Sequence, residues 1–384
     1  MRRVYLDHNA STPVHPEVLA AMVPYFGEQY GNPSSIHSFG REARDAVEVA
    51  REEITNFLGV SKEELVFTSG GTESDNLAIK GVALARRTGH IITSQVEHHA
   101  VLRTCQTLER AGYAVTYLAV DEHGWVDPDD VRRAIRPETM LVTIMYANSE
   151  VGTIMPIEEI ARIASEHGIP FHVDAVQAFG KIPFAARELG VSLLSCSSHK
   201  IYGPKGIGGL YIRKGTKMVS IQHGGDHERR RRAGTENVPA IVGFAKAVTI
   251  RGRDMADEGV RVTGLRNRLW DEMRARVADV RLNGHPTRRL PGTLNMSFRG
   301  VEAESLILAL DLKGIGASAG SACTSGSLEP SYVLTAMGVP TEWALGALRV
   351  SLGGSTSADD IDYVLNVLPA AVHRMRALSP AALA

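Results

Sequence analysis

One stretch of the chain joins a strand to a glycine-rich loop through residues that can do chemistry. The apolar run Val191–Cys196 predicts a buried strand, and Ser197, His199 and Lys200 follow it closely. A charged lysine is costly in such a place, but the cost is useful if the amine must lose its proton and attack a carbonyl. Lysines that form a Schiff base with an aldehyde cofactor such as pyridoxal phosphate do this, and Ser197 and His199 would then donate hydrogen bonds to the phosphate. The alternative is a surface lysine that happens to follow a strand.

A second stretch is built like an anion-binding site. Leu65–Thr68 predicts a strand, Ser69–Asn76 is a glycine-containing turn, and Leu77–Ala85 predicts a helix. Free backbone N–H groups and the positive helix end would point to one spot beside Gly71 and Thr72. No Gly-Lys-Ser/Thr follows, so the turn is not a Walker loop. A capped helix without a ligand is the alternative.

Polar side chains follow several predicted strands where each strand ends. Strands alternate with helices from Leu65 to Ile212, which predicts an α/β fold with a mostly parallel sheet covered by helices on both faces. The carboxyl ends of parallel strands meet at one edge of a sheet, and ligands bind there. Five such positions carry polar groups: Thr72, His98, Ser149, Asp174 and Lys200. Packing alone does not explain this pattern, so we expect them to share one site.

The composition excludes several classes of protein. The chain has 384 residues, 44% hydrophobic and 22% charged, with a net charge of -1, and its length predicts about two domains. The balanced charge gives no electrostatic footprint for nucleic acid or an anionic membrane, and no stretch reaches the length of a membrane span. Three cysteines without a Cys-x-x-Cys pair favour a reducing, cytoplasmic setting. His223 and His227 lie in a glycine loop, so we expect no metal site there.

Two residues near the C-terminus have the chemistry to act on a substrate. The loop Ala317–Ser327 holds almost only small residues, so Cys323 lacks apolar cover and suits a nucleophile that must travel. A free cysteine in a linker is the alternative. Arg349 falls among apolar neighbours in a predicted helix, Trp343–Leu352, from which its guanidinium would face a carboxylate.

These stretches together resemble the cysteine desulfurases of the NifS and IscS type, which are class-V aminotransferases of fold-type I. The resemblance runs from Tyr5 to Leu378. Its motifs are Tyr5-Leu-Asp-His-Asn-Ala, Gly31-Asn-Pro-Ser-Ser-Ile-His, Phe67-Thr-Ser-Gly-Gly-Thr-Glu-Ser-Asp-Asn, Glu97-His98, His172-Val-Asp-Ala-Val-Gln, Ser198-His-Lys-Ile-Tyr-Gly-Pro-Lys-Gly and Ser321-Ala-Cys-Thr-Ser-Gly-Ser-Leu-Glu-Pro-Ser. The last is the most specific, because it holds both the nucleophile and the longer loop of the NifS/IscS group.

The resemblance implies a large domain with a mostly parallel seven-stranded sheet sandwiched by helices, plus a smaller α+β domain. We expect residues 12–258 to form the large cofactor-binding domain. Residues 1–11 and 259–384 would form the small domain and carry the mobile Cys323 loop. A homodimer with shared sites is also implied, because Thr235 resembles a phosphate ligand donated by the partner subunit.

Roles for the residues around the cofactor follow from the same resemblance. Lys200 would form the Schiff base with pyridoxal 5'-phosphate, and Asp174 would keep the ring nitrogen protonated. His98 would stack on the ring and move protons, while Gln177 would reach the phenolic oxygen. The phosphate ligands would be Gly71, Thr72, Ser197, His199 and, from the partner subunit, Thr235.

The resemblance also assigns the substrate side. Asn32 and Arg349 would receive the carboxylate of L-cysteine, and Cys323 would take its sulfur as a persulfide, leaving L-alanine. The sulfur would pass to an iron–sulfur scaffold or a sulfur carrier, for cluster assembly or tRNA thiolation. One position departs from the family pattern: relatives with Asn-Asn-Glu contact the cofactor oxygen through the second Asn, which is Ser149 here. The shorter serine leaves that contact open.

Two other functions fit parts of the pattern. Another fold-type-I enzyme, such as a selenocysteine lyase or an aminotransferase, would share Lys200 and Asp174. An aminotransferase would consume a keto acid and has no need for Cys323. A non-catalytic scaffold that recruits sulfur-transfer partners would have a damaged site, whereas Lys200, Asp174, His98 and Cys323 are all present.

Overall fold

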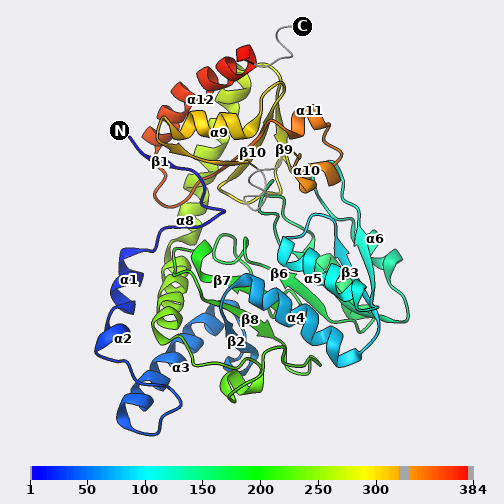
Figure 1. The fold of residues 1–384 in the computed structure, drawn as a ribbon, viewed down its shortest axis with the longest axis vertical. Helices are drawn as coiled ribbons and strands as arrows, with labels where there is room; N and C mark the ends of the chain where they lie inside the picture. The colour runs from blue at the N-terminus through cyan, green and yellow to red at the C-terminus, as the bar shows by residue number, and fades with distance from the viewer. Residues whose placement is uncertain (1, 320–328, 379–384) are drawn as a thin grey trace.

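The structure is a computed structural model that describes residues 2–319 and 329–378. A seven-stranded sheet forms the centre of the larger part of the molecule (Figure 1). Cys323 therefore lies outside the described residues. The strands are β2 (Leu65–Thr68), β3 (His90–Ser94), β4 (Ala114–Leu118), β5 (Thr139–Met145), β6 (Phe171–Asp174), β7 (Leu193–Ser197) and β8 (Gly208–Ile212). Their order in space is β2-β8-β7-β6-β5-β3-β4, and only β8 runs antiparallel to its neighbours. The predicted fold class is confirmed.

Helices cover both faces of this sheet, each through an apolar stripe. The larger part contains α1 (Pro16–Met22), α2 (Pro24–Gly27), α3 (Ser38–Leu58), α4 (Gly71–Arg86), α5 (His99–Arg110), α6 (Pro128–Ala134) and α7 (Ile157–Glu166), with short 3₁₀ turns at Lys62–Glu64, Ser198–Lys200 and His227–Arg230. In α3 the buried residues Val47, Ala50, Ile54 and Leu58 recur at helical spacing, and Gly59 ends the helix with φ 68°. Helices α4 and α5 pack on one face, while α3, α7 and the first half of α8 (Val238–Arg276) pack on the other.

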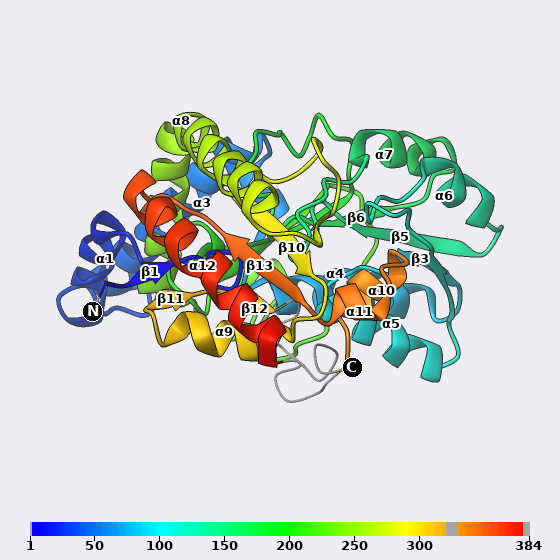
Figure 2. The same cartoon turned by 90° about the horizontal axis from the view of Figure 1, so that it is seen from above.

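A smaller antiparallel sheet has its own apolar core (Figure 2). It contains β9 (Val280–Asn283), β10 (Thr293–Phe298), β12 (Ser318–Ala319) and β13 (Ala347–Ser351), in the order β12-β13-β10-β9. Its helices are α9 (Ala303–Asp311), α10 (Tyr332–Ala336), α11 (Thr341–Ala344) and α12 (Ala358–Leu378). The N-terminal strand β1 (Val4–Tyr5) pairs with β11 (Ile315–Gly316), so the first residues of the chain join the core of the C-terminal part.

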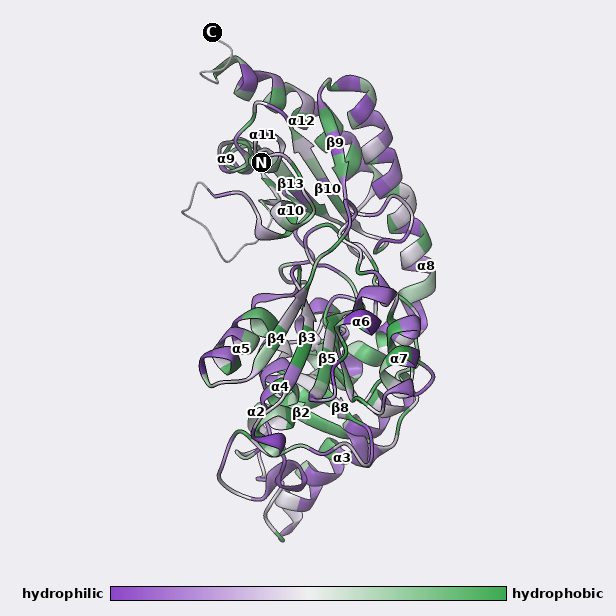
Figure 3. Ribbon diagram, turned by 90° about the vertical axis from the view of Figure 1, so that its right-hand side faces the viewer, coloured by the Kyte–Doolittle hydropathy of each residue, from purple (hydrophilic) through white to green (hydrophobic). Residues whose placement is uncertain are grey.

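The long helix α8 runs along both parts of the molecule (Figure 3). Its first half buries Ile241, Phe244 and Val248 in the larger core, and its second half buries Leu269 and Met273 in the smaller one. The boundary predicted at residue 258 falls within this helix and stays a prediction. In the part of the chain that the structure describes, no helix is long and apolar enough to cross a membrane.

The helix predicted over Trp343–Leu352 is wrong. Only Thr341–Ala344 is helical, and Ala347–Ser351 is strand β13, which lies between β12 and β10. Leu348 and Val350 enter the small core while Arg349 lies between them, which is the period-two pattern of a strand. The predicted helix Leu77–Ala85 also begins earlier, at Gly71.

Candidate active site

A cavity of about 220 Å³ is lined by residues that follow the strands of the large sheet. Every predicted cofactor-binding residue except Thr235 lines it: Gly71, Thr72, His98, Ser149, Asp174, Gln177, Ser197, His199 and Lys200. The five predicted strand-end positions therefore meet in one place, as the parallel topology requires.

One end of this cavity suits an anion. Helix α4 begins there, and its N-cap residue Gly70 offers no side chain to the free N–H groups of the first turn. Gly70 has φ 147°, and a side chain at Gly208 on the neighbouring strand would meet the Cα of Gly70 at 2.7 Å. Both glycines are needed for strand and turn to approach so closely. The uncapped helix start, beside the hydroxyls of Thr72 and Ser197, can accept a phosphate.

His199 lies at the same end in its neutral form. Burial, together with the charges of Lys200, Lys205 and Lys181, lowers the pKa of His199 to about 4. Its Nδ1 lies 3.3 Å from the hydroxyl of Ser11. The ring can therefore offer a hydrogen bond to an anion without carrying a full charge of its own.

The amine of Lys200 is held by the N-terminal segment. Lys200 Nζ donates to the main-chain oxygen of Asn9 at 2.6 Å and to that of Ala10 at 2.8 Å. Neutral carbonyl oxygens satisfy the amine without an acidic partner at these two contacts, so its position does not depend on a salt bridge with them. Lys200 thus lies in the cavity wall with its nitrogen fixed in place.

Asp174 supplies a carboxylate at the end of β6. Its Oδ1 accepts a hydrogen bond from the N–H of Val176 at 2.9 Å. Burial raises the pKa of Asp174, while His98, the Val176 N–H and Lys200 lower it. A bound cationic N–H would lower this pKa further and complete the pairing of the carboxylate.

His98 is the N-cap of helix α5. Its Nδ1 accepts a hydrogen bond from the N–H of Ala100 at 3.1 Å, and burial lowers the pKa of the ring. The neutral ring must therefore carry its proton on Nε2, because Nδ1 acts as the acceptor. In this arrangement His98 offers an Nε2–H donor to the cavity, and Nδ1 becomes a free base only if the cap opens.

Arg349 and Ser149 meet at the border between the two parts. Arg349 donates to Asp7 Oδ1 at 2.8 Å and to the main-chain oxygen of Ser149 at 3.3 Å. The guanidinium is buried and does not line the cavity, but it contacts Ser149, which does, and it already has one carboxylate partner in Asp7. Ser149 takes part in this contact through its backbone, and its side chain lines the cavity.

Asn32 and Thr235 do not join this cavity in a single chain. Asn32 lies in the loop between α2 and α3, where its side chain accepts a hydrogen bond from the N–H of Ser34 at 2.9 Å. Thr235 is exposed in the segment before α8. Their predicted roles stay predictions, as does that of Cys323. Among the described residues no group of three or more side chains could hold a metal ion.

Two residues near Lys200 were not identified from the sequence. Asn9 lies inside the motif Tyr5–Ala10, but its carbonyl contact with Lys200 has no sequence signature. Lys181 follows Gln177 by four residues, and its Nζ donates to Gln177 Oε1 at 2.8 Å. The spacing of these two side chains was the available signal for Lys181.

The cavity fits pyridoxal phosphate chemically. An uncapped helix start faces one end, the buried carboxylate of Asp174 can pair with a protonated ring nitrogen, and the amine of Lys200 lies within the wall. These features together are what an enzyme with an aldehyde cofactor on an α/β fold requires of its site.

The comparisons with known proteins agree with this class. The profile of the aminotransferase class-V family matches residues 4–364. The cysteine desulfurase IscS of Dictyoglomus turgidum is 54% identical over 381 residues, covering 99% of this chain and 97% of the relative. The cysteine desulfurase IscS of Methanosarcina thermophila is 52% identical over 381 residues, covering 99% and 94%.

Solved structures give the same result. A NifS-like protein superposes with a TM-score of 0.92 at 39% identity, covering 97% of this chain and 100% of the other. A structure of SspA in complex with cysteine has a TM-score of 0.81 at 38% identity, covering 91% and 99%. The chain belongs to the class-V aminotransferase family, and within it to the cysteine desulfurases of the NifS/IscS type, as the sequence motifs predicted.

A buried carboxyl beside His98 gives a test of this environment. Glu97 Oε1 accepts hydrogen bonds from Ser94 Oγ at 2.6 Å and from the Met145 N–H at 3.0 Å, and burial raises the pKa of Glu97 to about 8. The folded state therefore holds a proton that the unfolded state releases near pH 4.5. The stability of the protein should fall as pH rises from the lower value to the higher one.

Glu97→Gln removes this titration, because the amide stays neutral at every pH. Relative to the original protein, the variant should gain unfolding free energy as the pH is raised, by roughly 1 to 4 kcal/mol between about pH 5 and pH 9. Urea unfolding at a series of pH values measures the difference. A difference that stays constant with pH would show that Glu97 is ionised in the folded protein.

Proposed function

We propose that the chain binds pyridoxal 5'-phosphate in this cavity and converts L-cysteine to L-alanine, with Cys323 taking the sulfur. The observation that carries the proposal is the meeting of the Lys200 amine, the Asp174 carboxylate and the uncapped start of α4 in one cavity. Two similar chains are named cysteine desulfurase IscS, and the similar SspA structure is described as a complex with cysteine.

The described residues divide the work of holding the cofactor. Gly71, Thr72, Ser197 and His199 would bind its phosphate. Asp174 would hold the proton on its ring nitrogen. When bound, the cofactor withdraws electrons from the carbon next to the substrate amine and so makes its α proton acidic.

Lys200 is the residue that would move the proton. Its Nζ, which donates to the carbonyls of Asn9 and Ala10, would hold the cofactor, and as a free amine the same nitrogen would take the α proton of the substrate. Hydrogen bonds to these two carbonyls would hold the free amine close to the substrate. His98 would orient the reacting groups through its Nε2–H.

Sulfur transfer needs a thiolate that can reach the substrate. The Cys323 sulfur forms a bond to the cysteine sulfur, and the Cβ–S bond breaks with its electron pair left on the organic fragment, which is protonated to alanine. The other two cysteines are unsuited, because burial raises the pKa values of Cys105 and Cys196 to about 12. Cys105 lies in the apolar core that helix α5 shares with the sheet.

Arg349 would bind the substrate carboxylate, with Asn32 beside it. The exchange is chemically simple for Arg349, because its present partner Asp7 is also a carboxylate. The persulfide sulfur would then pass to an iron–sulfur scaffold or a sulfur carrier in the cytoplasm, for cluster assembly or tRNA thiolation.

We also propose that the chain forms a homodimer with shared sites. Exposed apolar side chains recur along α1, α2 and the loop before α3, where Phe26 is 67% and Ile36 is 91% exposed. Leu19, Val23 and Tyr30 in the same segment are exposed as well. Asn32 lies in this region, so a second copy that covered it would give Asn32 and Thr235 a site to join.

The reaction is tested by the fate of the sulfur. Protein loaded with pyridoxal phosphate is mixed with L-cysteine without reductant, and the mass of the peptide that contains Cys323 is measured by mass spectrometry. We expect one added sulfur on that peptide and release of alanine. Cys323→Ala should still bind the cofactor but lose turnover of cysteine, because the acceptor thiol is gone. Lys200→Ala should lose the covalent link between the protein and pyridoxal phosphate. Normal turnover by Cys323→Ala, or consumption of a keto acid instead, would contradict the proposal.

The dimer is tested by molar mass in solution. Light scattering during gel filtration should give twice the mass of one chain, which is 41.5 kDa. Ile36→Glu, placed in the apolar surface, should shift the protein toward monomer because it buries a charge at the contact. Leu312→Glu, at an exposed apolar residue directly after α9, is the matched control. A monomeric original protein would refute the proposal.

A further inference from the structure

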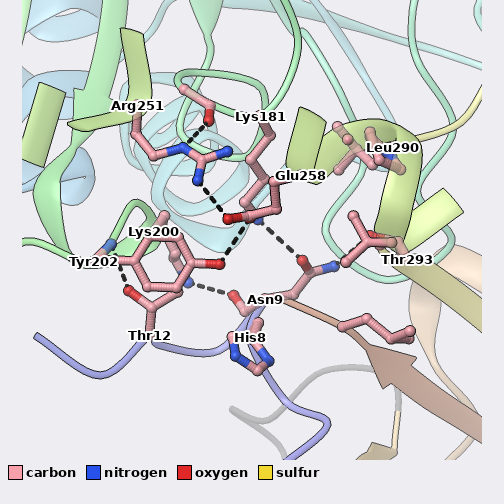
Figure 4. A pocket seen from close by; sticks show the side chains of 16 residues that line it. His8, Asn9, Thr12, Lys181, Lys200, Tyr202, Arg251, Glu258, Leu290 and Thr293 are labelled. Carbon is pink, nitrogen blue, oxygen red and sulfur yellow. Dashed lines mark hydrogen bonds and ion pairs between the residues drawn. The ribbon is translucent and has the colours of Figure 1, made fainter. Parts of the chain in front are cut away.

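A second, smaller cavity of about 30 Å³ shares the Lys200 side chain with the cofactor cavity (Figure 4). Its lining includes Lys181, Arg251, Tyr202 and Glu258. The function proposed above uses only Lys200 of these charged groups. Lys181 is half-buried beside a second amine, that of Lys200, and such a placement of a lysine is costly.

Lys181 contacts the residues that surround Lys200. Its Nζ donates to Gln177 Oε1 at 2.8 Å and to Asn9 Oδ1 at 3.1 Å. Burial and the charges of Lys200, Arg251 and Arg349 lower the pKa of Lys181, and Glu258 opposes this change. His8, whose pKa Lys181 helps to lower, faces the same space. The two hydrogen bonds make Lys181 a donor to both Gln177 and Asn9.

The contact with Gln177 decides which end of the amide faces the cofactor cavity. The two ends of a glutamine amide have nearly the same size, so only hydrogen bonds fix its orientation. Lys181 occupies the oxygen end, which leaves Nε2 to donate to the main-chain oxygen of Asn9 at 3.0 Å. Nε2 has a second proton, and Gln177 lines the cofactor cavity. That second N–H is available to the cofactor only in this orientation.

The contact with Asn9 acts on Lys200 itself. The Asn9 side chain accepts from Lys181 and donates to the Ser149 oxygen at 3.1 Å and to Thr293 Oγ1 at 2.9 Å. The Asn9 main-chain oxygen then accepts from both Lys200 and Gln177. One asparagine, fixed by its side chain, therefore carries the carbonyl on which the Lys200 amine rests.

We propose that Lys181 is a positioning residue for the reaction: through Gln177 and Asn9 it fixes an amide N–H toward the cofactor cavity and the carbonyl that holds the Lys200 amine. The proposal rests on the function proposed above. The two lysines have different acceptors: Lys181 Nζ donates to the side-chain oxygens of Gln177 and Asn9, whereas Lys200 Nζ donates to the main-chain oxygens of Asn9 and Ala10.

The test is a double-mutant cycle on the cofactor-loaded protein. Lys181→Met, Gln177→Ala and the double variant are titrated with pH while the visible absorption of the cofactor bound to Lys200 is recorded. Lys181→Met should raise the midpoint of this titration by about 1 unit. Without Lys181, the Gln177 amide is no longer held with an N–H toward the phenolic oxygen of the cofactor, and that donor is lost. The same substitution should have a much smaller effect when Gln177 is already alanine.

Controls separate this role from a general loss of structure. Lys217→Met, at an exposed lysine, should leave the midpoint unchanged. If Lys181→Met does not fold by circular dichroism, Lys181→Gln takes its place in the same cycle. An unchanged midpoint, or shifts from Lys181 and Gln177 that simply add, would overturn the proposal. If the original protein shows the cofactor spectrum but leaves cysteine intact, the proposed function fails while the cycle can still be read.

Discussion

The structure depends on holding the amine of Lys200 at the edge of a buried sheet through hydrogen bonds that are easily broken. The carbonyls of Asn9 and Ala10 satisfy Lys200 through neutral hydrogen bonds, which cost less to break than a buried ion pair. For these carbonyls to be in place, the N-terminal segment must cross from the small core to the large sheet. It is fixed on one side by the pairing of β1 with β11. On the other side the Thr12 N–H donates to the His199 oxygen at 2.9 Å.

The second constraint is the parallel sheet, which brings polar groups together where apolar burial is greatest. At these strand ends, burial raises the pKa values of Asp174 and Glu97 and lowers those of His98 and His199. Without a ligand, most of these groups are pushed toward their neutral forms by the same cause, burial. A phosphate and a protonated ring nitrogen would supply the charges that this environment lacks, which is why the site suits a cofactor that carries both.

The sequence predicted the features that depend on local pattern and on strand order. The alternation of strands and helices identified the sheet, and the rule for strand ends brought Thr72, His98, Asp174 and Lys200 to one cavity. Arg349 was placed on a helix, because a five-residue strand of alternating apolar residues is too short to outweigh its helix-forming neighbours. Asn9 and Lys181 were missed, because their contacts join residues far apart in the chain or depend on which end of an amide accepts.

The identity of the reactive lysine is the central claim, because Lys181 and Lys200 line the same small cavity. The direct measurement is to load the protein with pyridoxal phosphate, reduce the covalent link with borohydride, and map the modified peptide by mass spectrometry. The label should lie on Lys200, whose side chain also lines the cavity with Asp174. A label on Lys181, or no covalent label with the cofactor bound, would contradict the account.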